Sequence, residues 1–146
     1  MSPRESYSDR MTCQLRGSKA VSRASAAARV FGEAQSLTMD GLARLCIVIE
    51  ELVANLYEHG GVAHGDEVRL SLSKDAGGIR IILVDPGQPF DPRTASSHKP
   101  HPPRGGGAGI RIIRAWTRLV EYSVQPGSNR LELLMPIQTN EIHSGP

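Results

Sequence analysis

The most regular pattern of apolar residues in the sequence lies between Asp40 and His59. Apolar side chains recur there at steps of three and four residues, at Leu42, Leu45, Cys46, Ile49, Val53 and Leu56. Because an α-helix turns about once every 3.6 residues, this spacing predicts a helix with one apolar stripe. Asp40 is the expected N-cap, and the Gly60-Gly61 pair is expected to end the helix.

Two shorter runs of alternating residues follow this helix, EVRLSLS at 67–73 and IRIILVD at 79–85. The segment KDAGG joins them, so the pattern predicts an antiparallel hairpin with a glycine turn. The second run is apolar at nearly every position. We therefore expect residues 79–85 to form a central strand of the sheet.

Further segments complete the expected fold. Residues 11–17 (MTCQLRG) predict a first strand with a turn at Gly17, and the alanine-rich residues 22–34 predict a helix. Residues 109–119 predict another helix, and VEYSVQ and RLELLMPI predict a last hairpin around PGSN. This order predicts an α+β fold, a two-layer α/β sandwich whose mostly antiparallel sheet carries helices on one face.

Composition and charge narrow the class of protein. A chain of 146 residues is long enough for one domain, and 39% hydrophobic but only 4% aromatic residues imply an aliphatic core. We expect the domain to span 11–137, between a flexible tail at 1–10 and a second tail at 138–146. The net charge is only +2 and the basic residues are scattered, so direct binding to nucleic acid is not expected.

The sequence also bears on location. Its first residues, MSPRESYSDR, lack the apolar core of a signal peptide, and no apolar run is long enough to span a membrane. Cys13 and Cys46 have neither metal-binding nor redox spacing, and Cys46 lies on the apolar stripe, where a buried free thiol is expected. These features favour a cytoplasmic protein without a membrane partner.

Polar residues follow a second line along the long helix. Glu51, Asn55 and His59 recur every four residues, about a third of a turn from the apolar stripe, so they are expected at the edge of a groove. A Mg²⁺ ion that carries nucleotide phosphates keeps several waters, and the carbonyl oxygen of Asn55 suits it as a ligand. Glu51, one turn earlier, can accept a proton from an attacking hydroxyl or water. The same spacing also fits a solvated polar face.

A carboxylate ends the predicted central strand. Asp85 follows an apolar run, where an unpartnered carboxylate is unfavourable, and the amino group of adenine is one donor that would satisfy it. Gly87 leaves space where a flat base can approach the backbone. The alternative is an ordinary exit from a strand, because Asp-Pro-Gly is common in turns.

Glycines crowd the start of the next predicted helix, at Gly105, Gly106, Gly107 and Gly109. The N–H groups at a helix N-terminus bind anions, and glycines let phosphate oxygens approach them. A flexible linker is the alternative. The residues from 86 to 108 contain many Pro, Gly, His and Ser, and so long an irregular segment is more often functional than incidental.

Taken in this order, the three motifs resemble those of the GHKL ATPase superfamily, whose members have the Bergerat ATP-binding fold. LARLCIVIEELVANLYEHGG resembles the N box, DPGQPFDP the first glycine box and GGGAGIRIIRAW the second, and the resemblance covers about residues 12 to 137. The chain most closely resembles the stand-alone anti-sigma-factor serine/threonine kinases. The features typical of that branch are His59-Gly60, the segment PFDP at 89–92 and a short lid.

The resemblance implies a role for each motif residue. Glu51 would be the catalytic base, Asn55 the Mg²⁺ ligand, and Asp85 the adenine acceptor in a pocket shaped by Gly87. The phosphates of ATP would be wrapped by Gly105, Gly107, Ala108 and Gly109, with residues 91–104 as the ATP lid. The implied cofactors are ATP and Mg²⁺.

The resemblance also implies a function and partners. The protein would be an ATP-binding anti-sigma regulatory factor that phosphorylates a STAS-type anti-anti-sigma protein on serine or threonine and sequesters a sigma factor. Related kinases commonly act as dimers, so a homodimer is a further expectation. The alternative is an ATP-gated protein-binding switch without phosphotransfer. A histidine-kinase catalytic domain is disfavoured, because no phosphoacceptor helix precedes the predicted fold.

Overall fold

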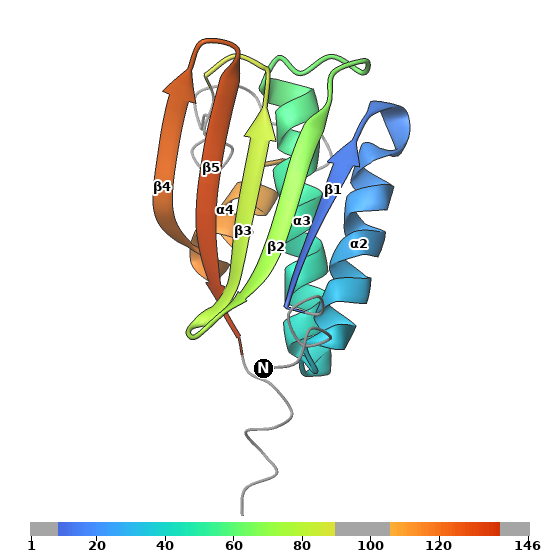
Figure 1. The fold of residues 1–146 in the computed structure, drawn as a ribbon, viewed down its shortest axis with the longest axis vertical. Helices are drawn as coiled ribbons and strands as arrows, with labels where there is room; N and C mark the ends of the chain where they lie inside the picture. The colour runs from blue at the N-terminus through green and yellow to red at the C-terminus, as the bar shows by residue number, and fades with distance from the viewer. Residues whose placement is uncertain (1–8, 90–105, 138–146) are drawn as a thin grey trace, which may run out of the picture.

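The computed structural model describes residues 9–89 and 106–137, which form a five-stranded antiparallel sheet with helices packed on one face (Figure 1). Along the chain the elements are β1 (Arg10–Leu15), η1 (Gly17–Lys19), α2 (Ala20–Ala34), α3 (Met39–His59), β2 (Val68–Asp75), β3 (Gly78–Asp85), α4 (Gly106–Trp116), β4 (Arg118–Gln125) and β5 (Ser128–Pro136). The strand order is β1-β2-β3-β5-β4. The predicted α+β sandwich is therefore confirmed.

The central position of β3 follows from its apolar sequence. This strand pairs with β2 on one side and β5 on the other, as predicted for the run at 79–85. Ile79, Ile81 and Leu83 point into the core and are at most 1% exposed. The same alternation turns Asp85, the last residue of the strand, toward the helices, where it is 5% exposed.

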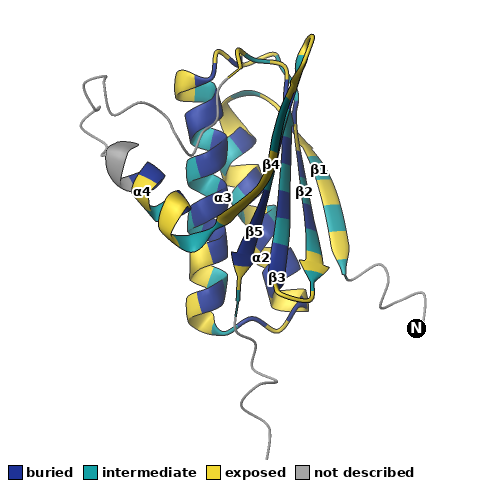
Figure 2. Ribbon diagram, turned by 90° about the vertical axis from the view of Figure 1, so that its left-hand side faces the viewer, coloured by how far each residue is buried: buried dark blue, intermediate teal, exposed yellow. Residues whose placement is uncertain are grey.

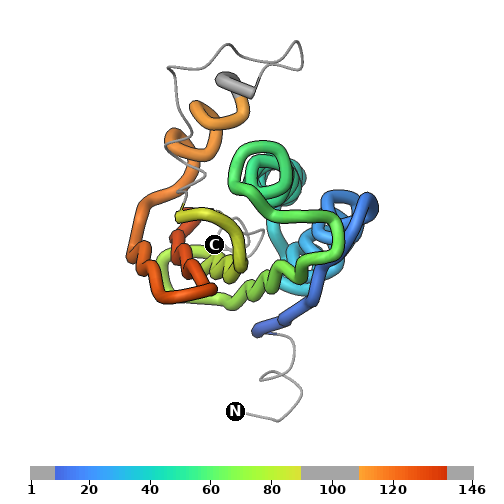
Figure 3. The backbone as a smooth tube through the Cα atoms, turned by 90° about the horizontal axis from the view of Figure 1, so that it is seen from above, coloured from blue at the N-terminus to red at the C-terminus, as the bar shows by residue number. Residues whose placement is uncertain are grey.

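Helix α3 covers the middle of the sheet with its apolar stripe (Figure 2). Leu45, Ile49, Val53 and Leu56 are at most 1% exposed, and Cys46 is a buried free thiol, as predicted. Seen from above, α3 lies between α2 and α4 (Figure 3). In the part of the chain that the structure describes, no helix is long and apolar enough to cross a membrane.

The start of α3 differs from the prediction, whereas its end agrees. The N-cap is Thr38, whose hydroxyl accepts a hydrogen bond from the N–H of Gly41 at 3.0 Å, so the prediction of Asp40 was wrong. Asp40 lies in the first turn instead, where its charge suits the helix dipole. At the other end, Gly60 is the C-cap and Gly61 has a φ of 73°, a conformation that glycine adopts without strain.

The helix expected at 109–119 is displaced toward the N-terminus. It runs as α4 from Gly106 to Trp116 and therefore includes glycines that were expected to precede it. Packing against α3 outweighs the low helix propensity of these glycines. At the C-terminal end, Arg118 pairs with Leu134 of β5, so the sheet takes residues that the periodicity assigned to the helix.

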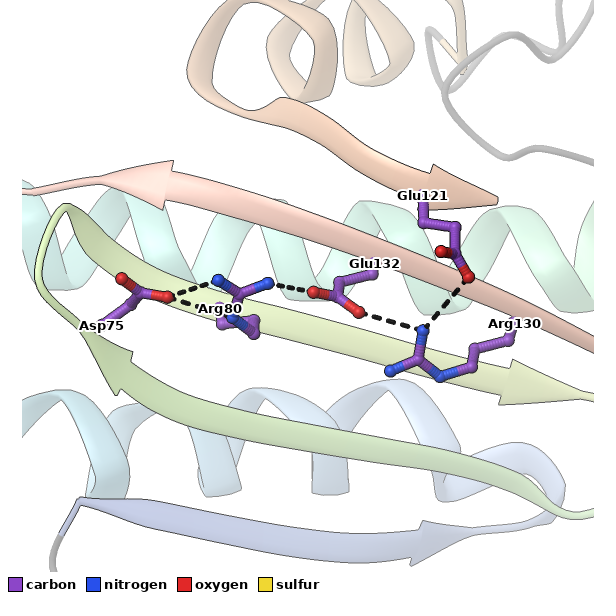
Figure 4. Close-up of polar contacts among 5 residues, drawn as sticks. All are labelled: Asp75, Arg80, Glu121, Arg130 and Glu132. Atoms are coloured by element: carbon purple, nitrogen blue, oxygen red, sulfur yellow. Dashed lines mark hydrogen bonds and ion pairs between the residues drawn. The ribbon is translucent and has the colours of Figure 1, made fainter. Parts of the chain in front are cut away.

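Among the described residues, no helix covers the other face of the sheet, which carries a row of ion pairs (Figure 4). Arg80 on β3 pairs with Asp75 on β2 and Glu132 on β5. Arg130 lies 2.9 Å from Glu132 and 3.9 Å from Glu121 on β4. The row therefore links four neighbouring strands through alternating charges.

Candidate functional site

The carboxylate of Asp85 lies at the buried end of β3, and its hydrogen bonds to other described residues use one oxygen. Oδ1 accepts hydrogen bonds from the backbone N–H of Gly87 at 2.8 Å and from the amide of Asn129 at 3.2 Å. Burial raises the pKa of Asp85, and these two hydrogen bonds partly lower it again. Because both contacts from the described residues go to Oδ1, the second oxygen can accept a hydrogen bond from a ligand.

Asn129 is a site residue that the sequence analysis missed. It is 2% exposed at the start of β5, directly opposite Asp85 in the sheet. Its Nδ2 donates to Oδ1 of Asp85 and also lies 3.0 Å from the carbonyl of Gly87 and 3.2 Å from that of Gln88. Asn129 therefore orients the carboxylate and holds the loop after β3. The sequence analysis placed Asn129 at the end of the predicted turn PGSN, whereas the structure includes it in β5.

Gly87 is packed so closely that it has no room for a side chain. A β carbon there would overlap the carbonyl oxygen of Gly60 and lie 2.9 Å from Cγ2 of Val62. In addition, the N–H of Gln88 donates to the Gly60 carbonyl at 2.8 Å. The loop that follows Asp85 is thus attached to the C-terminal end of α3.

Glu51 lies where α4 packs on α3. A β carbon on Gly109 would be 2.6 Å from Cδ of Glu51, so the carboxylate rests directly against this glycine. Glu51 is half-buried and Gly109 is buried. The structure therefore places the predicted base beside the first turn of α4, which is the predicted phosphate-binding segment.

Asn55 lies one turn after Glu51 and is 1% exposed, more deeply buried than a residue at the edge of a groove. His59, one turn further on, is exposed and lies 3.9 Å from Glu58. A nucleotide-bound Mg²⁺ ion needs only one or two oxygen ligands from protein, and the side-chain oxygen of Asn55 would be one of them. Mg²⁺ bound there would neutralise charge on the phosphates.

Other predicted site residues are described only in part. Gly107 and Ala108 lie in the first turn of α4, where helix N–H groups are available to anions. Gly105 and the expected lid at 91–104 fall outside the described residues.

Helix α3 is the common wall of the site. Its middle carries Glu51 and Asn55 and contacts α4, and its end at Gly60 holds the loop that follows Asp85. Glu51 and Gly60 are nine residues apart, or about 14 Å along a helix. The predicted adenine acceptor and the predicted phosphate-binding start of α4 therefore lie near different parts of α3, a separation that suits an extended nucleotide. A separate groove of about 630 Å³, which includes Asp40 and Arg44, lies near the start of α3 and contains none of the predicted site residues.

Comparison with known protein families agrees with this geometry. The family described as the histidine kinase-like ATPase domain matches residues 17–135, which is most of the chain. The protein therefore belongs to the histidine kinase-like ATPase domain family, and the predicted GHKL resemblance and Bergerat fold are confirmed. The domain is an ATP-binding one. No curated protein matches the sequence.

Proposed function

We propose that this protein is an ATP-dependent serine/threonine kinase that acts as an anti-sigma factor. Its substrate would be a STAS-type anti-anti-sigma protein, and its sequestered partner would be a sigma factor. The proposal includes a cytoplasmic location, which the free thiols of Cys13 and Cys46 favour because disulfides are rare there. A homodimer remains part of the proposal.

The observation that carries the kinase proposal is the position of Glu51 against α4. A switch that only binds ATP needs the adenine acceptor and the phosphate cradle. A kinase also needs a proton acceptor beside the phosphates, and Glu51 lies next to the helix start that would bind them.

The proposed reaction transfers the γ-phosphoryl group of ATP to a hydroxyl of the STAS protein. The hydroxyl oxygen forms a bond to the γ-phosphorus, the bond from that phosphorus to the β–γ bridging oxygen breaks, and ADP leaves. Glu51 accepts the proton of the attacking hydroxyl. Asp85 and the loop after it hold the base of the nucleotide far from the bonds that change.

Nucleotide binding is tested first by thermal unfolding with and without Mg-ATP. A ligand at about 100 times its Kd adds about 2.7 kcal/mol to the free energy of unfolding, so the midpoint must rise. We expect a clear rise for the wild type and a much smaller one for Asn55→Ala. Equal rises for the two proteins would contradict the role of Asn55.

Phosphotransfer is tested by intact-mass measurement of STAS-domain proteins from the same organism after incubation with the protein and Mg-ATP. We expect one of them to gain the mass of a single phosphate. Glu51→Ala should abolish the gain and keep the thermal shift with Mg-ATP. A thermal shift without any gain in mass across the set would support an ATP-gated switch instead.

A further inference from the structure

The contact between Glu51 and Gly109 leaves no space for a side chain on the glycine. A β carbon on Gly109 would lie 2.6 Å from Cδ and 3.2 Å from Cγ of Glu51, and closer still to Oε2. In proteins, β carbons essentially never approach other heavy atoms within 3.0 Å. The carboxylate of Glu51 therefore occupies the space that any other residue at position 109 would need.

The backbone of α4 provides no separate reason for a glycine at this position. Gly109 lies inside the helix and is not among the glycines with a positive φ. Glycine is unfavourable inside a helix, because it loses more backbone entropy on folding than any other residue. The need for space beside Glu51 accounts for Gly109, whereas the backbone conformation does not.

Packing holds both helices in place around this contact. Ile113 of α4 and Leu52 of α3 are completely buried. At the other end of α4, the guanidinium carbon of Arg44 lies 5.1 Å from the ring centroid of Trp116, a cation–π contact between the two helices. The side chain of Glu51 is the flexible part of the contact, so a methyl group at position 109 would displace the carboxylate and leave the helices in place.

The displacement matters for phosphoryl transfer because the Glu51 carboxylate lies beside the first turn of α4. The first turn of a helix carries partial positive charge and exposed N–H groups, so it attracts carboxylates and phosphates alike. A proton acceptor works only within hydrogen-bond reach of the attacking hydroxyl, and an error of about 1 Å in its position can lower a rate by about 100-fold.

We propose that Gly109 is a positioning residue for Glu51, which it allows to rest against the phosphate-binding end of α4. The inference rests on the proposed kinase function, because it explains how the base of that reaction is held in position. It differs from the expected role of Gly109 in wrapping the phosphates. A phosphate contact would affect nucleotide affinity, whereas a positioning contact affects the transfer step.

The test compares Gly109→Ala with Gly65→Ala, a control glycine with open space around it and no positive φ. Calorimetry measures the Kd for Mg-ATP, and steady-state transfer to the STAS protein measures kcat and KM. We expect Gly109→Ala to lower kcat by about 100-fold and to leave Kd and KM within about threefold of the wild type. Gly65→Ala should behave as the wild type. An unchanged kcat, or a loss of Mg-ATP affinity as large as the loss of kcat, would overturn the proposal.

A second measurement does not depend on activity. NMR of protein labelled with ¹³Cδ-glutamate reports the carboxylate of Glu51, whose signal is identified by its absence in Glu51→Gln. The signal should move in Gly109→Ala and stay in place in Gly65→Ala. If the wild type transfers no phosphate but the signal moves, the kinase function fails and the positioning contact stands. If the wild type is active and Gly109→Ala changes neither kcat nor the signal, the positioning role fails and the kinase function stands.

Discussion

Replacement of Asn129 by alanine should destabilise the protein by an amount that depends on pH. The amide of Asn129 bridges the Asp85 carboxylate and the carbonyls of Gly87 and Gln88, and both Asn129 and Asp85 are almost completely buried. The variant removes the donor that Asn129 supplies to the buried carboxylate of Asp85. It also removes the donor that the carbonyls of Gly87 and Gln88 share. No other described side chain donates a hydrogen bond to Asp85.

The expected cost follows from these contacts. A hydrogen bond to a charged group is worth about 1.5–3 kcal/mol, and one to a neutral carbonyl about 1 kcal/mol. Because Nδ2 has two hydrogens, it can satisfy about two of its three acceptors at a time. We therefore expect Asn129→Ala to lower the free energy of unfolding by about 3 kcal/mol where Asp85 is ionised and by about 1 kcal/mol where it is protonated.

The sign of the pH dependence follows from the pKa of Asp85, which burial raises in the folded state. Between the ordinary and the raised pKa, the folded protein binds more protons than the unfolded chain, so stability falls as pH rises through this window. Asn129 opposes the shift, and its loss raises the folded pKa further. The fall in stability should therefore be steeper in Asn129→Ala and should extend to higher pH.

Urea unfolding of the wild type and the variant at a series of pH values measures this difference directly. Ser128→Ala, the adjacent position on β5, controls for a change in the same strand. In an Asp85→Asn background, the cost of Asn129→Ala should not depend on pH, since the titrating group is gone. A cost that is the same at every pH in the protein that retains Asp85 would refute the assignment of Asn129 to that carboxylate.

Three further substitutions test other parts of the structure. Gly87→Ala places a methyl group on the backbone carbonyl of Gly60, so urea unfolding should show a loss of about 2 kcal/mol or more, and calorimetry weaker binding of Mg-ATP. Thr38→Ala removes the cap of α3 and should cost about 1 kcal/mol in urea unfolding, with the Kd for Mg-ATP unchanged. The guanidinium of Arg80 lowers the pKa of Asp75, so the ion pair between them contributes stability that is lost as pH falls through that lowered pKa. Asp75→Asn should therefore reduce the slope of the free energy of unfolding against pH on the acid side. High salt should reduce the difference between the variant and the wild type.

The elements with strong periodicity could be predicted from the sequence alone. Helix α3 and strand β3 each bury a continuous apolar pattern, so the pattern and the tertiary structure demand the same conformation. The helix cap was less predictable, because Thr38 and Asp40 are both favourable capping residues and only the geometry decides between them. The limits of α4 depended on packing and strand pairing that local propensity does not contain.

The candidate site was also predictable only in part, because some of its residues depend on tertiary packing. Glu51, Asp85 and Gly87 stand in recognisable motifs, so the sequence alone could single them out as candidates, and their roles toward a ligand stay predictions. Asn129 belongs to no motif, since its role depends on a pairing with a residue 44 positions away. The closeness of Gly109 to Glu51 depends likewise on how α4 docks on α3. Long-range register and helix docking are the steps that a single sequence leaves open.

The two ends of the site should respond to mutation in different ways. Under the proposed function, contacts at Asp85 would act on the nucleobase, which is the same in the bound substrate and in the transition state. We therefore expect their loss to weaken binding and to leave the transfer step itself unchanged. The proposed positioning contact between Glu51 and Gly109 would act when the hydroxyl proton leaves, so we expect its loss to lower kcat. A protein that only switched on ATP would need the adenine acceptor and the phosphate cradle but no proton acceptor. In the proposed kinase, Glu51 resting against Gly109 would supply the proton acceptor that a switch does not need, so this end of α4 is where we expect the two functions to separate.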